Sequence, residues 1–478
     1  MGSLFHYIGL LLLLEGIAMT ATLPCTIVYP TLTPYSMPLS ALLTLSSGFV
    51  LYAVSRKSLR DGLDIRDMSL LLTLSWVLVS LFGALPYLLS GVLPSFVDAF
   101  FESVSGFTAT GASVIRDLDI VPRDVLLWRS ITQWLGGVGI VVLAIVVLPY
   151  LGTTGHQFMM TDINCLAFEK LSPKIVRATR KLWLLYMAFT ILLAGLLLLG
   201  DMTLYEAINH AMTTMSSGGF STNNANIGEY SIYTQSVILV FMFISGLNLL
   251  TLFLSIRSRS NMFKDQEFKY YRFIILLFSI LVFLGLVVTR TIEPLSAVRE
   301  SLFSVVSILT TTGFYVSDYS LWPTFLWTML FVLMFVGASA GSTTGGVKLI
   351  RYYLLSSNTM KEQERILHPN ALLPVKINDK NVADEIVNKA MAFLLLYVLV
   401  FIIGSIVLLL QGYDFQTSFG ASVACLGNIG PSIGSVGPFH TYHFMTPIAK
   451  VVLSFVMLIG RLELFAVLVL FSKHFWHK

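Results

Sequence analysis

Four short polar stretches interrupt a largely apolar chain of 478 residues. They are Thr108-Ala109-Thr110-Gly111, Ser216-Ser217-Gly218-Gly219, Thr310-Thr311-Thr312-Gly313 and Gly427-Asn428-Ile429-Gly430. Glycine allows positive φ, so each stretch can turn its carbonyl groups to one side. A ring of such carbonyl oxygens can replace the hydration shell of an alkali cation, and a lining made only of oxygen suits hard cations. The predicted chemistry is therefore cation binding by backbone, with close packing of helices at the glycines as the alternative.

The composition indicates an integral membrane protein. Hydrophobic residues make up 56% of the chain and charged residues 12%, with a mean hydropathy of +0.80, whereas soluble domains carry about 25% charged residues. The three cysteines, Cys25, Cys165 and Cys425, lie far apart, and the eight histidines lack metal-ligand spacing. The pattern offers neither a disulfide framework nor a zinc site.

One pattern recurs four times from Ser69 onward: a long apolar span, a shorter mixed segment that ends in a polar stretch, and a second long span. The final glycines of the stretches are 108, 94 and 117 residues apart. The expected segments are 69–91, 95–112 and 126–149; 182–200, 203–220 and 233–255; 272–289, 296–314 and 323–346; and 390–411, 414–431 and 447–471. Such repeats predict a pseudo-symmetric assembly built from one chain.

Each mixed segment is too short to cross a bilayer, which takes about 20 helical residues. We expect a re-entrant half-helix that leads into each polar stretch. Acidic residues precede the final glycine by a constant interval in three copies, at Asp98, Glu206 and Glu300, while the fourth has Thr417 with Asp414 nearby. An acid near a helix N-terminus complements the macrodipole, and ordinary helix-end charge explains the same residues equally well.

The predicted fold is all-α, with ten transmembrane helices and four helix–pore loop–helix units around one pore. Two apolar spans at 4–24 and 37–54 precede the repeats as an N-terminal pair. The expected units are 1–66, 67–151, 152–258, 259–351 and 352–478. Most of the 30 Lys and Arg residues fall in the loops between copies and at the C-terminus, so that face and both termini are expected to be cytoplasmic.

These residues resemble the Trk/Ktr/HKT superfamily of potassium transporters, and within it the TrkH family. The resemblance rests on FFESVSGFTATGAS, MTTMSSGGFST, SILTTTGF, GASAGSTTGGVKLIR, GNIGPSIG and GRLELF. It implies K⁺ uptake across the plasma (inner) membrane of a prokaryote, in a homodimer with one pore per subunit. It also implies a cytoplasmic, nucleotide-binding TrkA-type partner that gates the pore.

The resemblance assigns the four polar stretches as a selectivity filter, with K⁺ held by backbone carbonyls. The carbonyls expected to do so belong to Thr110, Gly111, Ser217, Gly218, Thr311, Thr312, Asn428 and Ile429. Gly111 stands where Na⁺-preferring plant relatives carry serine, which favours K⁺. The stretches are chemically unequal, so selectivity among K⁺, Rb⁺ and Na⁺ is expected to be looser than in a fourfold channel.

Two features below the polar stretches are gate candidates. The segment 337–346, called here the interrupted segment, is too rich in glycine for a stable helix. Its gate residues are expected to be Gly337, Gly341, Ser342, Thr343, Thr344, Gly345, Gly346 and the following Lys348. Close helix packing is the alternative reading. Arg461 lies within the last apolar span and is expected to form a cationic barrier in the pore, or else an ion pair with Glu463.

Two other classes of function compete with a channel-like pore. A secondary transporter would couple K⁺ uptake to H⁺ or Na⁺. A membrane-embedded enzyme would need convergent reactive groups, but His210 and Cys425, the polar candidates, sit in different repeats and are expected to be packing residues. The sequence lacks a nucleotide-binding fingerprint, so we expect no organic cofactor. The small net charge of +4 is expected to reflect membrane topology and not nucleic-acid binding. The basic loop 348–389 is the expected docking surface for the regulatory partner, and contact with anionic membrane lipid explains its charge as well.

Overall fold

The computed structural model describes residues 2–31, 33–56, 65–137, 139, 175–258, 262–371, 373–378 and 380–476. Within these ranges the chain is almost wholly helical, and the strands described are β1 (Lys376–Ile377) and β2 (Lys380–Asn381), which form one antiparallel hairpin. Six helical segments are long and apolar enough to cross a membrane, or up to eight when two bent helix pairs are counted. The all-α, multi-span expectation is therefore confirmed, although 138 and 140–149 of the expected span at 126–149 lie outside the described residues.

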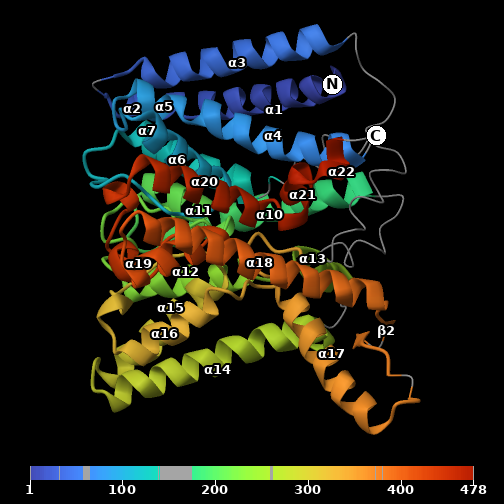
Figure 1. Cartoon of the computed structure of the whole chain (residues 1–478). Coiled ribbons are helices and arrows are strands. Elements are labelled where there is room, and N and C mark those ends of the chain that lie inside the picture. The colour runs from blue at the N-terminus through green and yellow to red at the C-terminus, as the bar shows by residue number, and fades with distance from the viewer. Residues whose placement is uncertain are drawn as a thin grey trace.

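An N-terminal pair of helices packs along one edge of the molecule (Figure 1). It comprises α1 (Gly2–Thr20) and α3 (Ser36–Ser55), joined through the short α2 (Leu23–Val28). The two long helices approach closely at glycines: a Cβ on Gly48 would lie 2.9 Å from the nitrogen of Leu13, and one on Gly9 would lie 2.6 Å from the nitrogen of Tyr52. The absence of side chains at these positions lets the two backbones meet.

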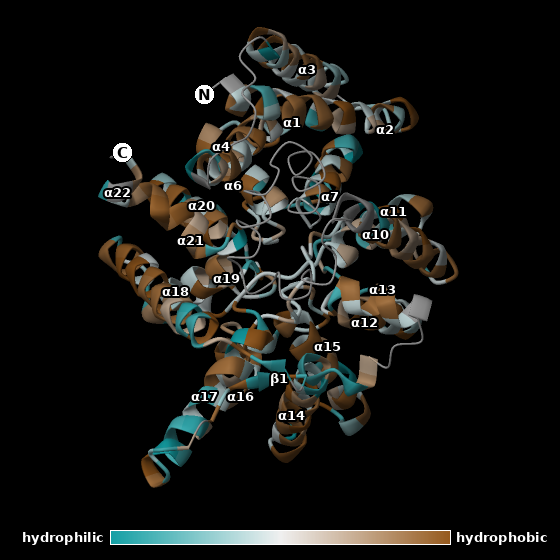
Figure 2. Ribbon diagram, turned by 90° about the vertical axis from the view of Figure 1, so that its right-hand side faces the viewer, coloured by the Kyte–Doolittle hydropathy of each residue, from teal (hydrophilic) through white to brown (hydrophobic). Residues whose placement is uncertain are grey.

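Four groups of helices follow in chain order, and they surround a centre formed by irregular segments (Figure 2). The first group has α4 (Ile65–Gly83), α5 (Leu85–Leu89), α6 (Phe96–Phe107) and α7 (Arg123–Gly137); the second has α10 (Ile175–Leu198), α11 (Leu204–Met215), α12 (Ile232–Ser245) and α13 (Leu249–Ser258). The third has α14 (Gln266–Val288), α15 (Pro294–Leu309), α16 (Thr324–Leu333) and α17 (Leu349–Leu367); the fourth has α18 (Asp384–Leu410), α19 (Phe415–Gly427), α20 (Pro447–Arg461), α21 (Leu464–Leu468) and α22 (Lys473–Trp476). The repeat pattern expected from the sequence is thus present in space.

The half-helices are α6, α11, α15 and α19, and each begins at a polar cap or a proline. In α11, Thr203 and Glu206 form a reciprocal capping box, and in α19 the Asp414 carboxylate accepts from the Thr417 N–H at 3.0 Å. Helix-end charge therefore accounts for Glu206 and Asp414. Asp98 of α6 has a further partner, because Lys450 Nζ of α20 lies 2.6 Å from its Oδ1.

Two spans expected to be continuous are sharply bent. The expected span 233–255 divides into α12 and α13 at an angle of 98°, and 447–471 divides after Arg461 at 119°. The first bend is held by the interrupted segment, since the Gly246 carbonyl accepts from the Ser339 N–H at 3.1 Å. At the second bend Glu463 adopts φ 60° and pairs with Arg351. Apolar composition predicted these spans, but the bends depend on contacts from another repeat.

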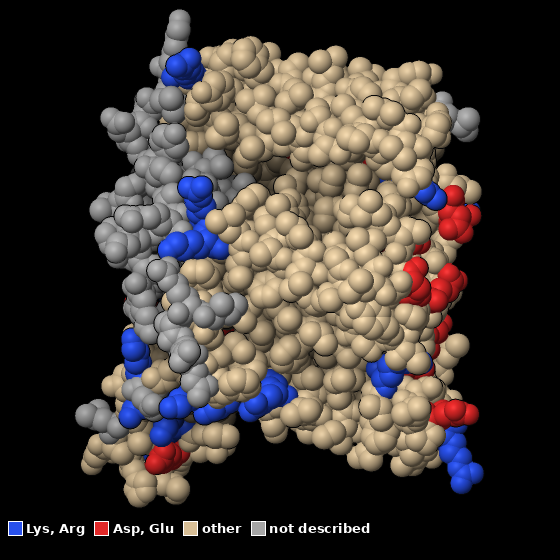
Figure 3. All heavy atoms as spheres, turned by 180° about the vertical axis from the view of Figure 1, so that it is seen from behind, with Lys and Arg blue, Asp and Glu red and all other residues tan. Residues whose placement is uncertain are grey.

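Charge is divided between the two ends of the molecule. Most visible Lys and Arg side chains gather at one end and most visible Asp and Glu at the other (Figure 3). The start of α1, α22 and the β1–β2 hairpin all lie at one end of the bundle (Figure 1). Between these ends, helices such as α14 and α18 expose large apolar side chains, among them Phe273, Ile280 and Leu395, as expected of surfaces in contact with lipid.

Candidate ion pathway

The four polar stretches share one backbone conformation. Each half-helix ends and the chain then passes through a left-handed residue, at Ala109, Ser217, Thr311 and Asn428, with φ of 53°, 56°, 52° and 54°. Two residues later comes a glycine with positive φ: 83° at Gly111, 73° at Gly219, 75° at Gly313 and 91° at Gly430. Non-glycine residues rarely adopt this conformation, so its fourfold recurrence marks the stretches as equivalent.

Their hydrogen bonds repeat in the same way. The N–H of the third residue in each stretch donates to a carbonyl five residues earlier in its own half-helix. These bonds are Thr110 to Ser105 at 2.9 Å, Gly218 to Thr213 at 2.9 Å, Thr312 to Ser307 at 2.9 Å and Ile429 to Ala424 at 2.8 Å. The half-helices therefore fix the four stretches in a common geometry even though the side chains differ.

The four stretches contact one another in a closed ring. A Cβ on Gly111 would lie 2.2 Å from the carbonyl oxygen of Gly218, one on Gly219 would lie 1.8 Å from that of Thr312, and one on Gly313 would lie 2.0 Å from that of Ile429. A Cβ on Gly430 would lie 2.7 Å from the oxygen of Thr110, which closes the circle. We call the carbonyls of Thr110, Gly218, Thr312 and Ile429 the carbonyl ring. Glycine is required at all four contacts because a side chain would strike the neighbouring backbone.

Threonine hydroxyls support the ring from within their own stretches. Thr108 Oγ1 lies 2.6 Å from Thr110 Oγ1 and donates to the Val104 carbonyl at 2.7 Å, and the pair Thr310 and Thr312 repeats the contact at 2.9 Å. The amide of Asn428 donates to Thr110 Oγ1 at 2.9 Å and so ties the fourth stretch to the first. These contacts show that the hydroxyl groups stabilise the loops.

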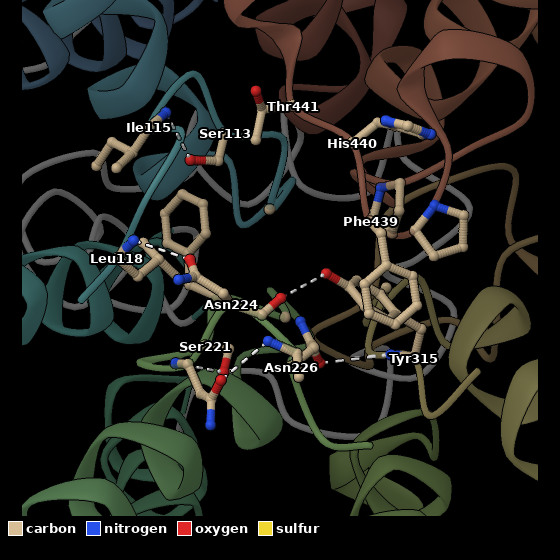
Figure 4. A pocket seen from close by; sticks show the side chains of 18 of the residues that line it. Ser113, Ile115, Leu118, Ser221, Asn224, Asn226, Tyr315, Phe439, His440 and Thr441 are labelled. Atoms are coloured by element: carbon tan, nitrogen blue, oxygen red, sulfur yellow. Dashed lines mark hydrogen bonds between the residues drawn. The ribbon is translucent and has the colours of Figure 1, made fainter. Parts of the chain in front are cut away.

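A cavity of about 380 Å³ lies against Gly111, Gly219 and Gly313 of the first three stretches and against Pro431, the residue that follows the fourth (Figure 4). Two asparagines of the second repeat join its walls: Asn224 Oδ1 accepts from the Leu118 N–H at 2.8 Å, and Asn226 Oδ1 accepts from the Tyr315 N–H at 3.4 Å. At the rim, hydrogen bonds from the Asn224 amide and the Asp119 N–H hold the pKa of Asp117 below its usual value. A carboxylate therefore stays charged between Arg116 and Leu118, which line the cavity.

A buried ion pair lies behind the first two stretches. Glu102 of α6 and Arg129 of α7 are both almost completely buried, with Arg129 Nε 2.8 Å from Glu102 Oε1. Arg129 also donates to the Ser221 carbonyl at 3.3 Å, and its guanidinium lies 3.8 Å from the ring centroid of Phe220. The pair thus connects the half-helix of the first repeat to the chain that leaves the second stretch.

The interrupted segment lies directly against the polar stretches. Thr343 Oγ1 lies 2.9 Å from Ser217 Oγ, and the Gly345 N–H donates to Thr311 Oγ1 at 2.8 Å. A Cβ on Gly345 would lie 2.4 Å from the Gly427 carbonyl. The segment is non-helical, and Gly341 and Gly346 have φ of 71° and 66°. The irregular loop expected here is present, in contact with three of the four stretches.

Two buried cations are adjacent to this segment. Lys348 Nζ donates to the Thr344 carbonyl and lies 3.0 Å from its hydroxyl, while Ser342 Oγ is 3.5 Å away. Arg461 donates to the Thr343 carbonyl at 2.8 Å and to the Gly136 carbonyl at 2.7 Å. Arg461 is the last residue of α20, at the bend, rather than the middle of a continuous span. Both of these contacts of its terminal nitrogens are with backbone oxygen, not with Glu463.

Other functional candidates from the sequence are buried among packed side chains, and the His210 ring also lies 6.0 Å, centroid to centroid, from that of Phe314 in the third repeat. His210 is fully buried in α11, with Nε2 3.1 Å from Ser221 Oγ, and Cys425 is fully buried in α19. No group of three His, Cys, Asp or Glu side chains that could hold a metal ion occurs among the residues that the structure describes. Sequence reasoning missed Glu102, Arg129, Gln133 and Lys450. A signal existed for two of them, because Arg129 and Gln133 are polar residues one helical turn apart in an apolar span.

Four re-entrant units with irregular backbone buried at their centre, together with several helices able to span a membrane, define a multi-pass membrane protein of the transport class. The family model TrkH, described as a cation transport protein, matches residues 41–478. The chain therefore belongs to the TrkH family of cation transport proteins, which is a family of transporters and not of enzymes.

Relatives match almost the full length. The Trk system potassium uptake protein TrkH of Halomonas elongata is 36% identical over 99% of this chain and 99% of its own length. That of Escherichia coli strain K12 is 37% identical over 91% of this chain and 90% of its own. The crystal structure of the potassium transporter TrkH from Vibrio parahaemolyticus superposes with a TM-score of 0.88 at 33% identity, covering 100% of this chain and 99% of that one.

Proposed function

We propose that this protein takes up K⁺ across the plasma membrane of a prokaryotic cell through a channel-like pore. The observation that carries the proposal is the closed carbonyl ring, in which each of four repeats supplies one equivalent backbone oxygen. Such rings offer an alkali cation oxygen ligands in place of its water. The names of the relatives, which are potassium uptake proteins, support K⁺ as the transported ion.

The four polar stretches act as the selectivity filter in this proposal. K⁺ is coordinated by carbonyls of Thr110 and Gly111, Ser217 and Gly218, Thr311 and Thr312, and Asn428 and Ile429. The cavity beside Gly111, Gly219 and Gly313 serves as the outer vestibule. The shared left-handed turns support this assignment, because they present the backbone of all four stretches in one orientation.

The interrupted segment serves as the gate. Its contacts with Ser217, Thr311 and the Gly427 carbonyl, which join it to three of the four stretches, support this role. Lys348 and Arg461 add positive charge there and raise the electrostatic cost of cation passage. A loop held by hydrogen bonds to several repeats can move without unfolding any span, which suits a gating element.

Regulation and assembly follow the family in this proposal. The protein forms a homodimer with one pore per subunit, and a cytoplasmic nucleotide-binding partner of the TrkA type docks on the basic surface of 348–389 and moves the gate. Both termini are cytoplasmic, in line with the gathering of Lys and Arg at one end (Figure 3).

Uptake of radioactive Rb⁺ into proteoliposomes, with and without an imposed pH or Na⁺ gradient, tests the proposal. Channel-like flow predicts that Rb⁺ accumulates down its own gradient and that K⁺ competes with it, whatever the other gradient. Uptake that requires a H⁺ or Na⁺ gradient would instead establish the alternative, an ion-coupled secondary K⁺ transporter. Absence of K⁺-competable uptake under every condition would refute both.

A further inference from the structure

A glutamine from the first repeat holds the polar stretch of the second. Gln133 is completely buried on α7. Its Nε2 donates to the Gly218 carbonyl at 2.6 Å, and its Oε1 accepts from the Phe220 N–H at 3.0 Å. One carboxamide therefore bridges the two peptide groups on either side of Gly219: its NH₂ group donates to the carbonyl of one, and its oxygen accepts from the N–H of the other.

The bridge makes the carbonyl ring unequal. The Gly218 oxygen accepts a side-chain hydrogen bond, whereas those of Thr110, Thr312 and Ile429 receive none from any residue within the described ranges. An oxygen that is bound by an amide keeps a fixed direction and shares its electron density between the amide and a cation. The second repeat thus contributes a ring oxygen whose position is set by a side chain outside the filter.

The sequence of the second stretch fits this role. The residue before the ring glycine is Thr110, Thr312 or Ile429 in the other repeats but Gly218 here. A Cβ on Gly218 would lie 2.4 Å from Gln133 Cδ and 2.5 Å from its Oε1. The second glycine of Ser216-Ser217-Gly218-Gly219 is therefore explained by the space that Gln133 occupies.

The equivalent position in the fourth repeat is apolar. Gly136 of the first repeat corresponds to Gly460 of the fourth, because each lies against the carbonyl just before the polar stretch of its own repeat. A Cβ on Gly136 would lie 2.1 Å from the Phe107 oxygen, and one on Gly460 would lie 2.0 Å from the Leu426 oxygen. Three residues before each glycine stand Gln133 and Met457. Met457 therefore cannot form the bridge that Gln133 forms, and the fourth stretch is tied to the first by the Asn428 amide instead.

Arg129 reinforces the bridge from one helical turn away, on the same face of α7. It donates to the Ser221 carbonyl and lies over Phe220, and Glu102 holds it in place. Two side chains of the preceding repeat thus form hydrogen bonds with successive backbone groups of the chain from Gly218 to Ser221.

We propose that Gln133 is a specificity-determining residue of the cation site, which positions the Gly218 carbonyl and so sets the preference of the ring for K⁺ over the smaller Na⁺. The proposal rests on the K⁺ transport proposed above. Loss of the bridge would free one of four ring oxygens to follow the ion, and a ring that contracts tolerates Na⁺ better.

The test compares Gln133→Met with the wild type in proteoliposomes. Methionine has nearly the same length, and the fourth repeat accommodates it. We expect the apparent KM for K⁺ to rise and the concentration of Na⁺ that halves Rb⁺ uptake to fall, each by roughly three- to tenfold, as for a lost buried hydrogen bond. The maximal rate should stay within roughly twofold. Ser130→Ala is the matched control, because Ser130 Oγ contacts only the Leu126 carbonyl of its own helix among described partners.

A second pair of variants separates positioning from packing. Gly218→Ala should abolish selective uptake because its methyl group would strike Gln133. The double variant Gln133→Ala/Gly218→Ala removes the clash but also lacks the carboxamide that holds the carbonyl of residue 218. Rb⁺ uptake should therefore return, while Na⁺ still competes strongly with it. Wild-type selectivity in Gln133→Met or in the double variant, with K⁺ uptake intact, would overturn the inference and leave the proposed function standing. A wild type without K⁺ uptake would refute the function itself.

Discussion

Arg461 Nη1 lies 2.8 Å from the carbonyl oxygen of Thr343, so α20 of the fourth repeat is bound to the interrupted segment of the third. Thr343 in turn contacts Ser217 of the second polar stretch through its hydroxyl, at 2.9 Å. Thr343 thus connects the buried guanidinium of Arg461 to the second polar stretch. The guanidinium thus links α20 to the loop, and in the proposed pathway it also contributes a positive charge.

Replacement of Arg461 by alanine should increase flux. It removes a cation from a low-dielectric region, where charge acts strongly, and frees the Thr343 carbonyl. We expect Rb⁺ uptake into proteoliposomes to rise several-fold. Arg461→Lys keeps the charge but cannot span both carbonyls, so an intermediate rate is expected. Unchanged or reduced uptake by a well-folded alanine variant would contradict a barrier role.

Substitution of the four ring glycines by alanine should damage transport to different degrees. The added methyl group would meet the neighbouring carbonyl at 1.8 Å for Gly219, 2.0 Å for Gly313, 2.2 Å for Gly111 and 2.7 Å for Gly430. We therefore expect loss of K⁺ over Na⁺ selectivity in all four variants, most severe at Gly219 and mildest at Gly430. Competition of Na⁺ against Rb⁺ uptake measures the order.

Glycine outside the ring provides the control for this series. Gly195 on α10 has open space where its Cβ would be, so Gly195→Ala should leave both selectivity and uptake unchanged. An equal effect at Gly195 and Gly219 would show that the assay reports general destabilisation and not ring geometry.

The sequence predicted much of this site because its local signals are strong. Half-helix length, the glycine at the end of each polar stretch and the glycine-rich break at 337–346 are all readable from spacing and composition. The partners across repeats are not readable in that way. The Gln133 bridge, the Glu102–Arg129 pair and the bends after Ser245 and Arg461 depend on which repeats touch, and that is fixed only when the ring closes.

The Glu102–Arg129 pair should be costly to break from one side. Both groups are buried, so Glu102→Gln leaves an uncompensated guanidinium, and loss of one partner of a buried pair costs about 3–5 kcal/mol. Thermal unfolding in detergent should reveal a lower transition temperature for Glu102→Gln. The double variant Glu102→Gln/Arg129→Gln should recover part of the loss, because neither side is then charged. If the losses measured for Glu102→Gln and Arg129→Gln alone simply add in the double variant, the two residues do not stabilise the protein as a pair.

Two neighbouring charges at the outer rim should act in opposite directions on K⁺ entry. Asp117 is kept anionic by hydrogen bonds, the Asn224 amide first, which hold its pKa below the usual value, while Arg116 is exposed and lines the cavity above the ring. Asp117→Asn should slow uptake at low K⁺ and Arg116→Gln should speed it, each by about twofold or less, because exposed charges are screened. Both effects should fade as ionic strength is raised with an impermeant salt.

The effect of Asp117 should also persist at mildly acidic pH. A group with a depressed pKa keeps its charge until the pH falls through that value. The difference in uptake between wild type and Asp117→Asn should therefore persist from pH ~8 down to pH ~4.5, above the reference carboxyl pKa of about 3.9. Loss of the difference within that range would contradict the stabilised carboxylate, and equal shifts in the two variants would contradict electrostatic attraction at the rim.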